Sequence, residues 1–288
     1  MEMFFYGFMQ RAFQASFLIA VIAPILGLFL ILRRQSLMAD TLSHISLAGI
    51  ALGLLLNINP TVMTLVVVVI AAVLIDYLRM LYKSYTEISI AILMSAGMAI
   101  ALVLMSLNDG GSNASIQQYL FGSIVTINQE QVYLLGALFV MVVGLFLVFR
   151  KPMYVLTFDE DTAFTAGLPT KLMSIIFNVI TGITIAVVMP IVGALLVSAI
   201  IILPAAIAMR LSKSFNIVIL MGVIIGIIGM FTGLTASYQY GTPPGATITL
   251  VFIVIFIITI FIKKGVNQVK YKKSRTPLAY SEKPKTKK

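Results

Sequence analysis

Asp40 and His44 are the residues whose types and spacing could most directly do chemistry in this 288-residue chain. A spacing of four places both side chains on one face of a helix. A carboxylate and an imidazole there could bind a transition-metal ion, because the carboxylate offsets the ion's charge and the imidazole suits zinc and similar ions. The alternative is a helix start, in which Asp40 caps the helix or pairs with Arg34 and His44 hydrogen-bonds between helices. Two ligands do not complete a site, so others would come from other helices, water or main-chain carbonyls.

The composition places these residues in a lipid bilayer. Sixty per cent of the chain is AVILMFWYC, only 10% is charged, and the mean hydropathy is +1.07, whereas soluble proteins carry roughly 25% charged residues. A soluble globule cannot bury that much apolar surface. Ionisable residues inside a membrane are costly, which makes them functional candidates by default.

Several classes of function are excluded by what the sequence lacks. The chain has no cysteine, which excludes disulfides, iron–sulfur ligation and thiol catalysis. A single histidine excludes a histidine-rich metal cage within one chain, and no G-x-x-x-x-G-K-S/T motif is present to bind ATP. No arrangement resembles a hydrolytic triad, so we expect a chain that is not an enzyme and holds no cofactor of its own.

Apolar runs of about 20 residues predict an all-α polytopic membrane protein. We expect nine crossings, or eight if one segment is re-entrant. An interfacial segment (1–14) should precede a transmembrane domain (15–264), and a basic, disordered tail (265–288) should follow it. The predicted crossings are 15–32, 37–56, 61–78, 88–107 and 132–149, two within 172–209 that turn near Pro190, and two within 214–262 that divide between 233 and 245.

The distribution of lysine and arginine predicts the orientation, because these residues collect in cytoplasmic loops. With nine crossings, every basic loop residue falls on one side of the membrane. The one exception is Arg11, ahead of the first crossing, which falls on the other side. The C-terminus is therefore expected in the cytoplasm and the N-terminus outside. The last 26 residues hold ten basic residues and one acid, +9 of the net charge of +10. The basicity thus belongs to a tail, which we expect on the anionic inner leaflet rather than on nucleic acid.

Two further acids lie close to predicted crossings. Glu87 begins the fourth crossing, where it either lines the same cavity as Asp40 and His44 or occupies a helix N-terminus whose dipole favours an acid. Asp76 lies one turn from Arg79, which predicts an ion pair at the membrane interface.

The predicted cytoplasmic loop at 152–170 has the pattern of a short helix. Thr157 or Asp159 can cap it, its first turn is acidic, and Gly167 with Pro169 ends it. Such a helix could dock a partner, or lie on the surface without one.

Four segments together resemble the membrane permease of bacterial ABC importers for zinc and manganese, the ABC-3 group. The resemblance runs from about Ala15 to Lys264. The segments are Leu32 to His44 with Leu47 to Ala51 and Asn59-Pro60; Tyr119 to Ser123; Val192 to Ser198 with Leu203 to Ala206 and Arg210; and Gly233-Leu234 with Thr242 to Gly245.

This resemblance implies a type II ABC importer-like permease in the bacterial cell membrane. Two copies would form a homodimer around a path, with separate ATPase subunits below that hydrolyse the ATP and an extracytoplasmic metal-binding protein above. Asp40 and His44 fall on the family's Asp-x-x-x-His, so two chains would offer up to four side-chain ligands to the transported ion. Glu87 aligns with an acidic position in family members.

The resemblance also implies that the cytoplasmic loop contains the coupling helix that touches the ATPase. Ala163 and Gly167 match its Ala-x-x-x-Gly pattern, and Asp159, Glu160 and Asp161 are its acidic start.

The cargo and the energy source leave alternatives. Overall similarity favours zinc over manganese, although the ligand pair would serve either ion. A proton-driven secondary transporter could use Asp40 and His44 as a proton relay, and an ABC permease for a chelated solute would give the pair no task.

The sequence departs from the family pattern at one position, because many relatives have an acid where this chain has Gly241.

Overall fold

The computed structural model describes residues 5–81, 86–107, 118–123 and 127–274. Throughout these ranges the regular secondary structure is helical, which confirms the all-α prediction. Eight helices are long and apolar enough to cross a membrane. They are α1 (Gly7–Leu32), α2 (Ser36–Leu55), α3 (Pro60–Leu81), α4 (Thr86–Ser106), α6 (Gln129–Phe158), α8 (Thr170–Val192), α10 (Phe215–Tyr240) and α11 (Pro244–Ser274).

A shorter apolar helix, α9 (Val197–Leu211), accounts for the difference between eight and nine. It follows α8 after a turn at 193–196, three residues beyond the predicted Pro190, which lies inside α8. The first turn of α11 lies against Val192 at the end of α8. At the other end, Lys263 of α11 donates to the carbonyl oxygen of Arg210 in the last turn of α9. Helix α9 therefore runs beside α11 over nearly the same depth of the bundle.

Local sequence explains where helices begin. The Asn59 side chain accepts from the Thr61 backbone N–H at 2.9 Å, and Pro60 occupies the first position of α3, where its missing N–H costs nothing. Asn128 and Gln131 form a reciprocal capping box at the start of α6. Both caps satisfy amide groups that would otherwise lack partners at a helix end.

Three predicted boundaries need correction. The interfacial segment predicted over 1–14 is not separate, because α1 begins at Gly7, Met9 is fully buried, and the Arg11 guanidinium donates to the carbonyl oxygen of Ile127 at 2.7 Å. Helix α6 continues through Pro152 to Phe158, which shortens the predicted loop. Helix α11 runs to Ser274, past the predicted tail boundary at 264, because no proline interrupts it before Pro277. The rest of the predicted tail, 275–288, lies outside the described residues.

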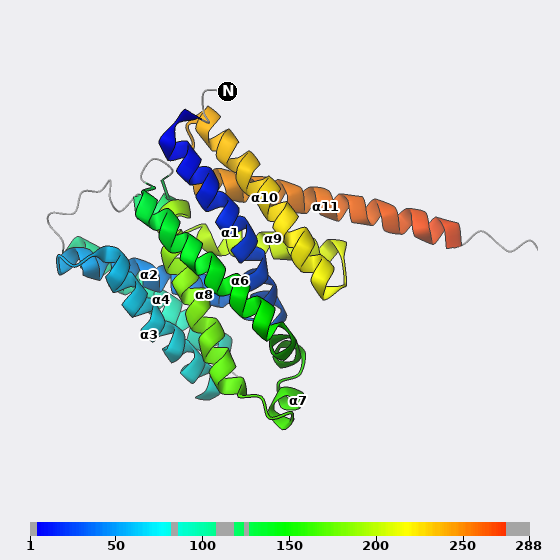
Figure 1. Cartoon of the computed structure of the whole chain (residues 1–288), viewed down its shortest axis with the longest axis horizontal. Coiled ribbons are helices and arrows are strands. Elements are labelled where there is room, and N and C mark those ends of the chain that lie inside the picture. The colour runs from blue at the N-terminus through cyan, green and yellow to red at the C-terminus, as the bar shows by residue number, and fades with distance from the viewer. Residues whose placement is uncertain (1–4, 82–85, 108–117, 124–126, 275–288) are drawn as a thin grey trace, which may run out of the picture.

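The helices form two groups with α8 between them (Figure 1). Helix α2 packs against α3 and α4, and α1 packs against α9 and α10, while the end of α11 projects beyond the bundle. Close approach depends on small residues. A Cβ on Gly97 of α4 would lie 2.7 Å from Ile45 of α2, and one on Gly27 of α1 would lie 2.1 Å from a carbonyl oxygen of α9.

The basic residues of several helices gather at one end of this bundle. Arg33 and Arg79 both reach Ser174, close to the start of α8. Arg150 of α6 donates to Asn216 at the start of α10. These contacts show that the described residues Arg33, Arg79 and Arg150 lie at one end of the bundle, as the charge pattern predicted. We call this end the inner end.

Candidate functional site

Asp40 and His44 lie in the second and third turns of α2 and are both partly exposed, among buried neighbours. The hydroxyl groups of Thr41, Ser43 and Ser46 donate to main-chain carbonyl oxygens four residues earlier, at 2.7–3.0 Å. These hydroxyls are therefore satisfied within the helix. The Nδ1 atom of His44 is different, because it is buried and has no hydrogen-bond partner in the described part of the chain.

The helix-start alternative for this pair does not hold. Gln35 is the N-cap of α2 and makes no side-chain cap, and Asp40 lies five residues further on. Within the described ranges Arg34 forms no ion pair with Asp40, and His44 makes no hydrogen bond to another helix. A carboxylate and an imidazole thus share one helix face without partners among the described residues. Their chemistry suits a divalent cation that arrives from outside it.

A third ligand is not supplied by the described residues, among which no three histidine or acidic side chains are close enough to hold a metal ion. Glu87 is exposed in the first turn of α4, where the helix dipole favours an acid. Thr41 of α2 lies 3.5 Å from the carbonyl oxygen of Ile90, one turn further along α4. Helix α4 is therefore adjacent to the pair, but Glu87 does not join it as a ligand group.

The predicted loop helix is present as α7 (Glu160–Thr165). Asp159 ends α6 and caps α7, because its carboxylate accepts from the Thr162 backbone N–H at 2.9 Å and from the Thr162 hydroxyl. These hydrogen bonds hold the pKa of Asp159 below its ordinary value of 3.8. Of the two predicted caps, Thr157 instead donates to the carbonyl oxygen of Met153 within α6.

The end of α7 explains the spacing of Ala163 and Gly167. Gly167 has φ +79 and its N–H donates to the Phe164 carbonyl oxygen at 3.0 Å, while the Leu168 N–H donates to that of Ala163 at 3.1 Å. This is a Schellman ending, which favours glycine at the left-handed residue. Ala163 is fully buried, whereas Phe164 is 70% exposed. The small residue lets α7 lie close to the bundle, and an aromatic side chain faces away from it.

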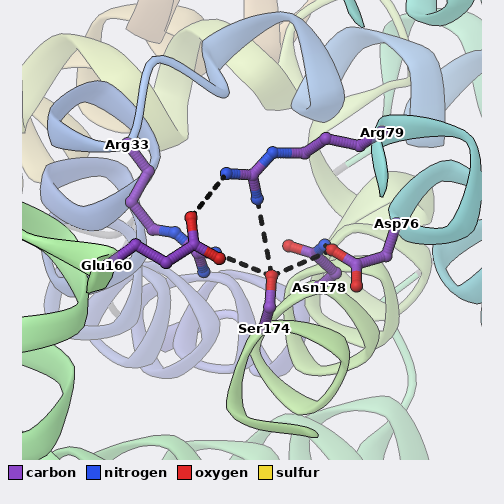
Figure 2. Close-up of polar contacts among 6 residues, drawn as sticks. All are labelled: Arg33, Asp76, Arg79, Glu160, Ser174 and Asn178. Carbon is purple, nitrogen blue, oxygen red and sulfur yellow. Dashed lines mark hydrogen bonds and ion pairs between the residues drawn. The ribbon is translucent and has the colours of Figure 1, made fainter. Parts of the chain in front are cut away.

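Six polar residues at the inner end form a cluster that the sequence did not reveal (Figure 2). We call it the inner-end polar cluster; its members are Arg33, Asp76, Arg79, Glu160, Ser174 and Asn178. Asp76 is only 2% exposed and accepts from Ser174 Oγ at 2.9 Å and from Asn178 Nδ2 at 2.7 Å, both on α8. Arg79 instead pairs with Glu160 of α7, at 3.8 Å. The predicted interfacial pair between Asp76 and Arg79 is therefore wrong for the described structure.

Arg33 brings a second cation into this cluster. Its Nη2 donates to Ser174 Oγ at 2.6 Å, whereas its buried Nη1 has no partner among the described residues. Burial first, and then the nearby Arg79, lower the pKa of Arg33 to about 10, while Asp76 and Glu160 act in the opposite direction. Arg33 therefore stays charged at neutral pH, and the cluster balances two cations with two anions. The polar pair Ser174 and Asn178, four residues apart in an apolar helix, is the signal that could have indicated it.

Three of the segments that carry the resemblance meet at the opposite end of the bundle. The Ala194 N–H donates to the Tyr119 carbonyl oxygen at 2.9 Å. Gly122 and Gly193 have φ +76 and +98, and a Cβ on either would lie within 2.5 Å of the other segment's backbone. A Cβ on Gly245 would lie 1.9 Å from the Val192 carbonyl oxygen. Glycine is required here because main chains touch directly.

Comparison with known proteins gives a consistent result. A model of the ABC 3 transport family matches residues 5–263. A Treponema pallidum protein named "Probable metal transport system membrane protein" is 33% identical over 88% of this chain and 95% of its own length. "Manganese transport system membrane protein MntC" of Halalkalibacterium halodurans is 26% identical over 91% and 90%. "High-affinity zinc uptake system membrane protein ZnuB" of Haemophilus influenzae is 26% identical over 87% and 95%.

A solved structure shares the fold. The structure described as PsaBC from Streptococcus pneumoniae in complex with Fab has a TM-score of 0.82 and 26% identity, and the match covers 93% of this chain and 97% of that one. Because the family model covers nearly the whole sequence and the fold agrees, this chain belongs to the ABC 3 transport family and is a metal-transport ABC permease.

Proposed function

We propose that this permease imports a divalent transition-metal ion past Asp40 and His44, with zinc as its cargo. The observation that carries the proposal is the buried Nδ1 of His44, which has no partner in the described chain and lies on the same helix face as Asp40. A buried polar atom without a partner is costly. An ion passing along this face would relieve that cost for the time that it is bound.

A second copy of the chain would complete the ligand set. Two Asp40–His44 pairs facing one another offer four side-chain ligands, although one described chain offers no third. A path needs ligands that replace the ion's water and then release it, so few and imperfect ligands suit transport better than a closed structural site does.

ATP hydrolysis would come from separate subunits at the inner end, with α7 as the contact. The exposed Phe164 and the acids Asp159, Glu160 and Asp161 offer an apolar and acidic surface there. An extracytoplasmic metal-binding protein would deliver the ion at the opposite end. Nucleotide-dependent contacts on α7 would shift the population between conformations open to either side.

The inner end would face the cytoplasm of a bacterial cell, because the basic loops gather there. This orientation puts the C-terminus in the cytoplasm and the N-terminus outside.

Manganese is the second candidate cargo. Relatives named for manganese are 26–27% identical to this chain, and a relative named for zinc is 26% identical. Imidazole and carboxylate bind both ions. The zinc proposal comes from the resemblance to zinc-uptake permeases noted in the sequence; these identities do not separate the two ions, and the experiment below does.

The test is the zinc and manganese content of cells that lack this gene, grown under chelation and complemented with wild type, His44→Ala or Asp40→Asn. We expect wild type to restore the zinc content. At equal protein level, both variants should take up at least tenfold less zinc than wild type under chelation. Ser46→Ala is the matched control, because the Ser46 hydroxyl is already satisfied within α2.

Three other outcomes are informative. Restoration of manganese instead of zinc would reassign the cargo and keep the path. Full rescue by His44→Ala would remove this residue from the path. Uptake that persists without any ATPase subunit, and collapses with the proton gradient, would favour the secondary transporter.

A further inference from the structure

The inner-end polar cluster connects α7 to the transmembrane helices through one arginine. Arg79 of α3 pairs with Glu160 of α7 and also lies 3.5 Å from Ser174 Oγ of α8 (Figure 2). Ser174 in turn donates to Asp76, one turn before Arg79 on α3. The position of α7 and the contact between α3 and α8 therefore share one side chain.

The two acids of the cluster differ sharply in their surroundings. Asp76 is 2% exposed and depends on Ser174 and Asn178, which both belong to α8. Separation of α8 from α3 would remove both partners together, and a buried carboxylate without partners is strongly destabilising. Glu160 is 57% exposed, so water replaces its partner at little cost.

Arg79 is the residue that can resolve this imbalance. Residues three apart on a helix are neighbours, so the Arg79 side chain can reach Asp76 without any movement of α3. We propose that Arg79 exchanges partners: it pairs with Glu160 while α7 and α8 lie against α3, and it passes to Asp76 when α8 separates from α3. The acid left behind is then the exposed Glu160, and the buried Asp76 is never without a partner.

This exchange rests on the proposed function, because it assigns a task to the helix on which the ATPase would act. A pull on α7 that stretches the Glu160–Arg79 pair would release Arg79 and permit the inner end to open between α3 and α8. Helix α3 packs against α2, where a Cβ on Gly49 would lie 2.7 Å from Thr64. Arg79, Asp76 and Glu160 are thus positioning residues for the helix that carries Asp40 and His44.

The absence of native cysteine makes a direct test practical. Spin labels at Val73→Cys on α3 and Thr165→Cys on α7, both exposed, report the separation of these helices by pulsed electron resonance. The full-length permease would be measured in lipid nanodiscs, without metal or nucleotide. Two isosteric variants are then compared with the labelled parent.

The exchange predicts opposite shifts for the two variants. Glu160→Gln releases Arg79 from α7, so a longer distance should gain population. Asp76→Asn still accepts from Ser174 and Asn178 but cannot attract Arg79 by charge, so the shorter distance should be retained and any longer population should disappear. Glu130→Gln, an exposed acid in the outer first turn of α6, is the matched control and should give the parent distribution.

The outcomes that would overturn the exchange are specific. A shift of both variants in one direction, or no shift in either while both elute as folded protein, contradicts it. If either variant fails to fold, the double variant Arg79→Glu with Glu160→Arg replaces it. This swap keeps an ion pair between α3 and α7 but sets a second acid beside Asp76, so it should hold the shorter distance. A longer distance in the swap would contradict the proposal.

Metal uptake measured in parallel separates this inference from the proposed function. Asp76→Asn should reduce uptake at least tenfold at equal membrane abundance, and normal uptake would remove the exchange from transport. If the distances shift as expected but wild type accumulates no metal, the exchange stands and the proposed function fails. If metal accumulates and the distances do not shift, the exchange fails alone.

Discussion

His44 is available to a ligand because its neighbours have used their hydrogen bonds elsewhere. The hydroxyls of Thr41, Ser43 and Ser46 are bound to the main chain of α2, and Asp40 has no partner in the described ranges. The same reasoning applies in reverse at Asp76, which already accepts hydrogen bonds from Ser174 and Asn178 of α8. Of two intramembrane acids, the unpaired one is the better candidate for transport and the paired one for structure or switching.

Gly245 allows a prediction at the scale of one residue. Gly245→Ala should destabilise the protein by about 1–3 kcal/mol, because the new Cβ meets the rigid carbonyl oxygen of Val192 and forces α11 away from α8. Gly136→Ala on α6 is the matched control, since a Cβ there meets nothing within 4 Å. Thermal unfolding in detergent, followed by size-exclusion chromatography, measures both. A melting temperature for Gly245→Ala equal to that of wild type would contradict the expectation.

Among the elements, α7 is the one whose stabilising contacts are most clearly identified. Six residues are too few for a helix to persist by propensity alone. Asp159 closes its start and Gly167 its end, and the buried Ala163 holds it to the bundle. A short helix fixed at three points can transmit displacement to its neighbours, whereas an unfixed one would fray.

The cap on α7 gives a pH-dependent prediction. The folded pKa of Asp159 lies below its ordinary value, so its stabilising effect is complete above that value and is lost as pH falls through the folded pKa. Hydrogen exchange of the α7 amides should therefore accelerate, relative to the intrinsic rate, as pH is lowered through the acidic range. Asp159→Asn keeps a capping oxygen and should remove this dependence, while Asp159→Ala should exchange fast at every pH. Identical profiles for all three would exclude the cap.

At the scale of the whole molecule, alternating helices bring the described basic residues Arg33, Arg79 and Arg150 to one end. This arrangement predicts which loops are accessible from each side of the cell membrane. A cysteine at Ile58, between α2 and α3, should react with a membrane-impermeant maleimide in intact cells. A cysteine at Thr165 should react only in inverted vesicles. The reverse pattern would invert the proposed topology.

Features that depend on neighbouring residues in the chain could be predicted from the sequence, whereas contacts between distant residues could not. Apolar length alone predicted the spans, and the acidic first turn with Gly167 predicted α7, because caps and spans are local. The length of α9 was ambiguous, since an uncharged run of 38 residues shows no boundary. The partners of Asp76 lie 98 and 102 residues away in the chain, and no local pattern specifies which helix α3 will face. The contact between Gly122 and Gly193 was equally hidden, because it joins two main chains and depends on no side chain.

Helix α6 has a mechanical consequence that follows from its continuity. Its 30 residues extend about 45 Å at 1.5 Å per residue, from the capping box at Asn128 to Phe158 at the inner end. Next to that box, the carbonyl oxygen of Ile127 accepts a hydrogen bond from Arg11 of α1. The other end of α6 is followed directly by α7. Because the outer end of α6 is held by Arg11, a displacement of α7 would turn α6 about that outer end. Pro152, which lacks the N–H that would complete the helix ladder, is its natural point of bending.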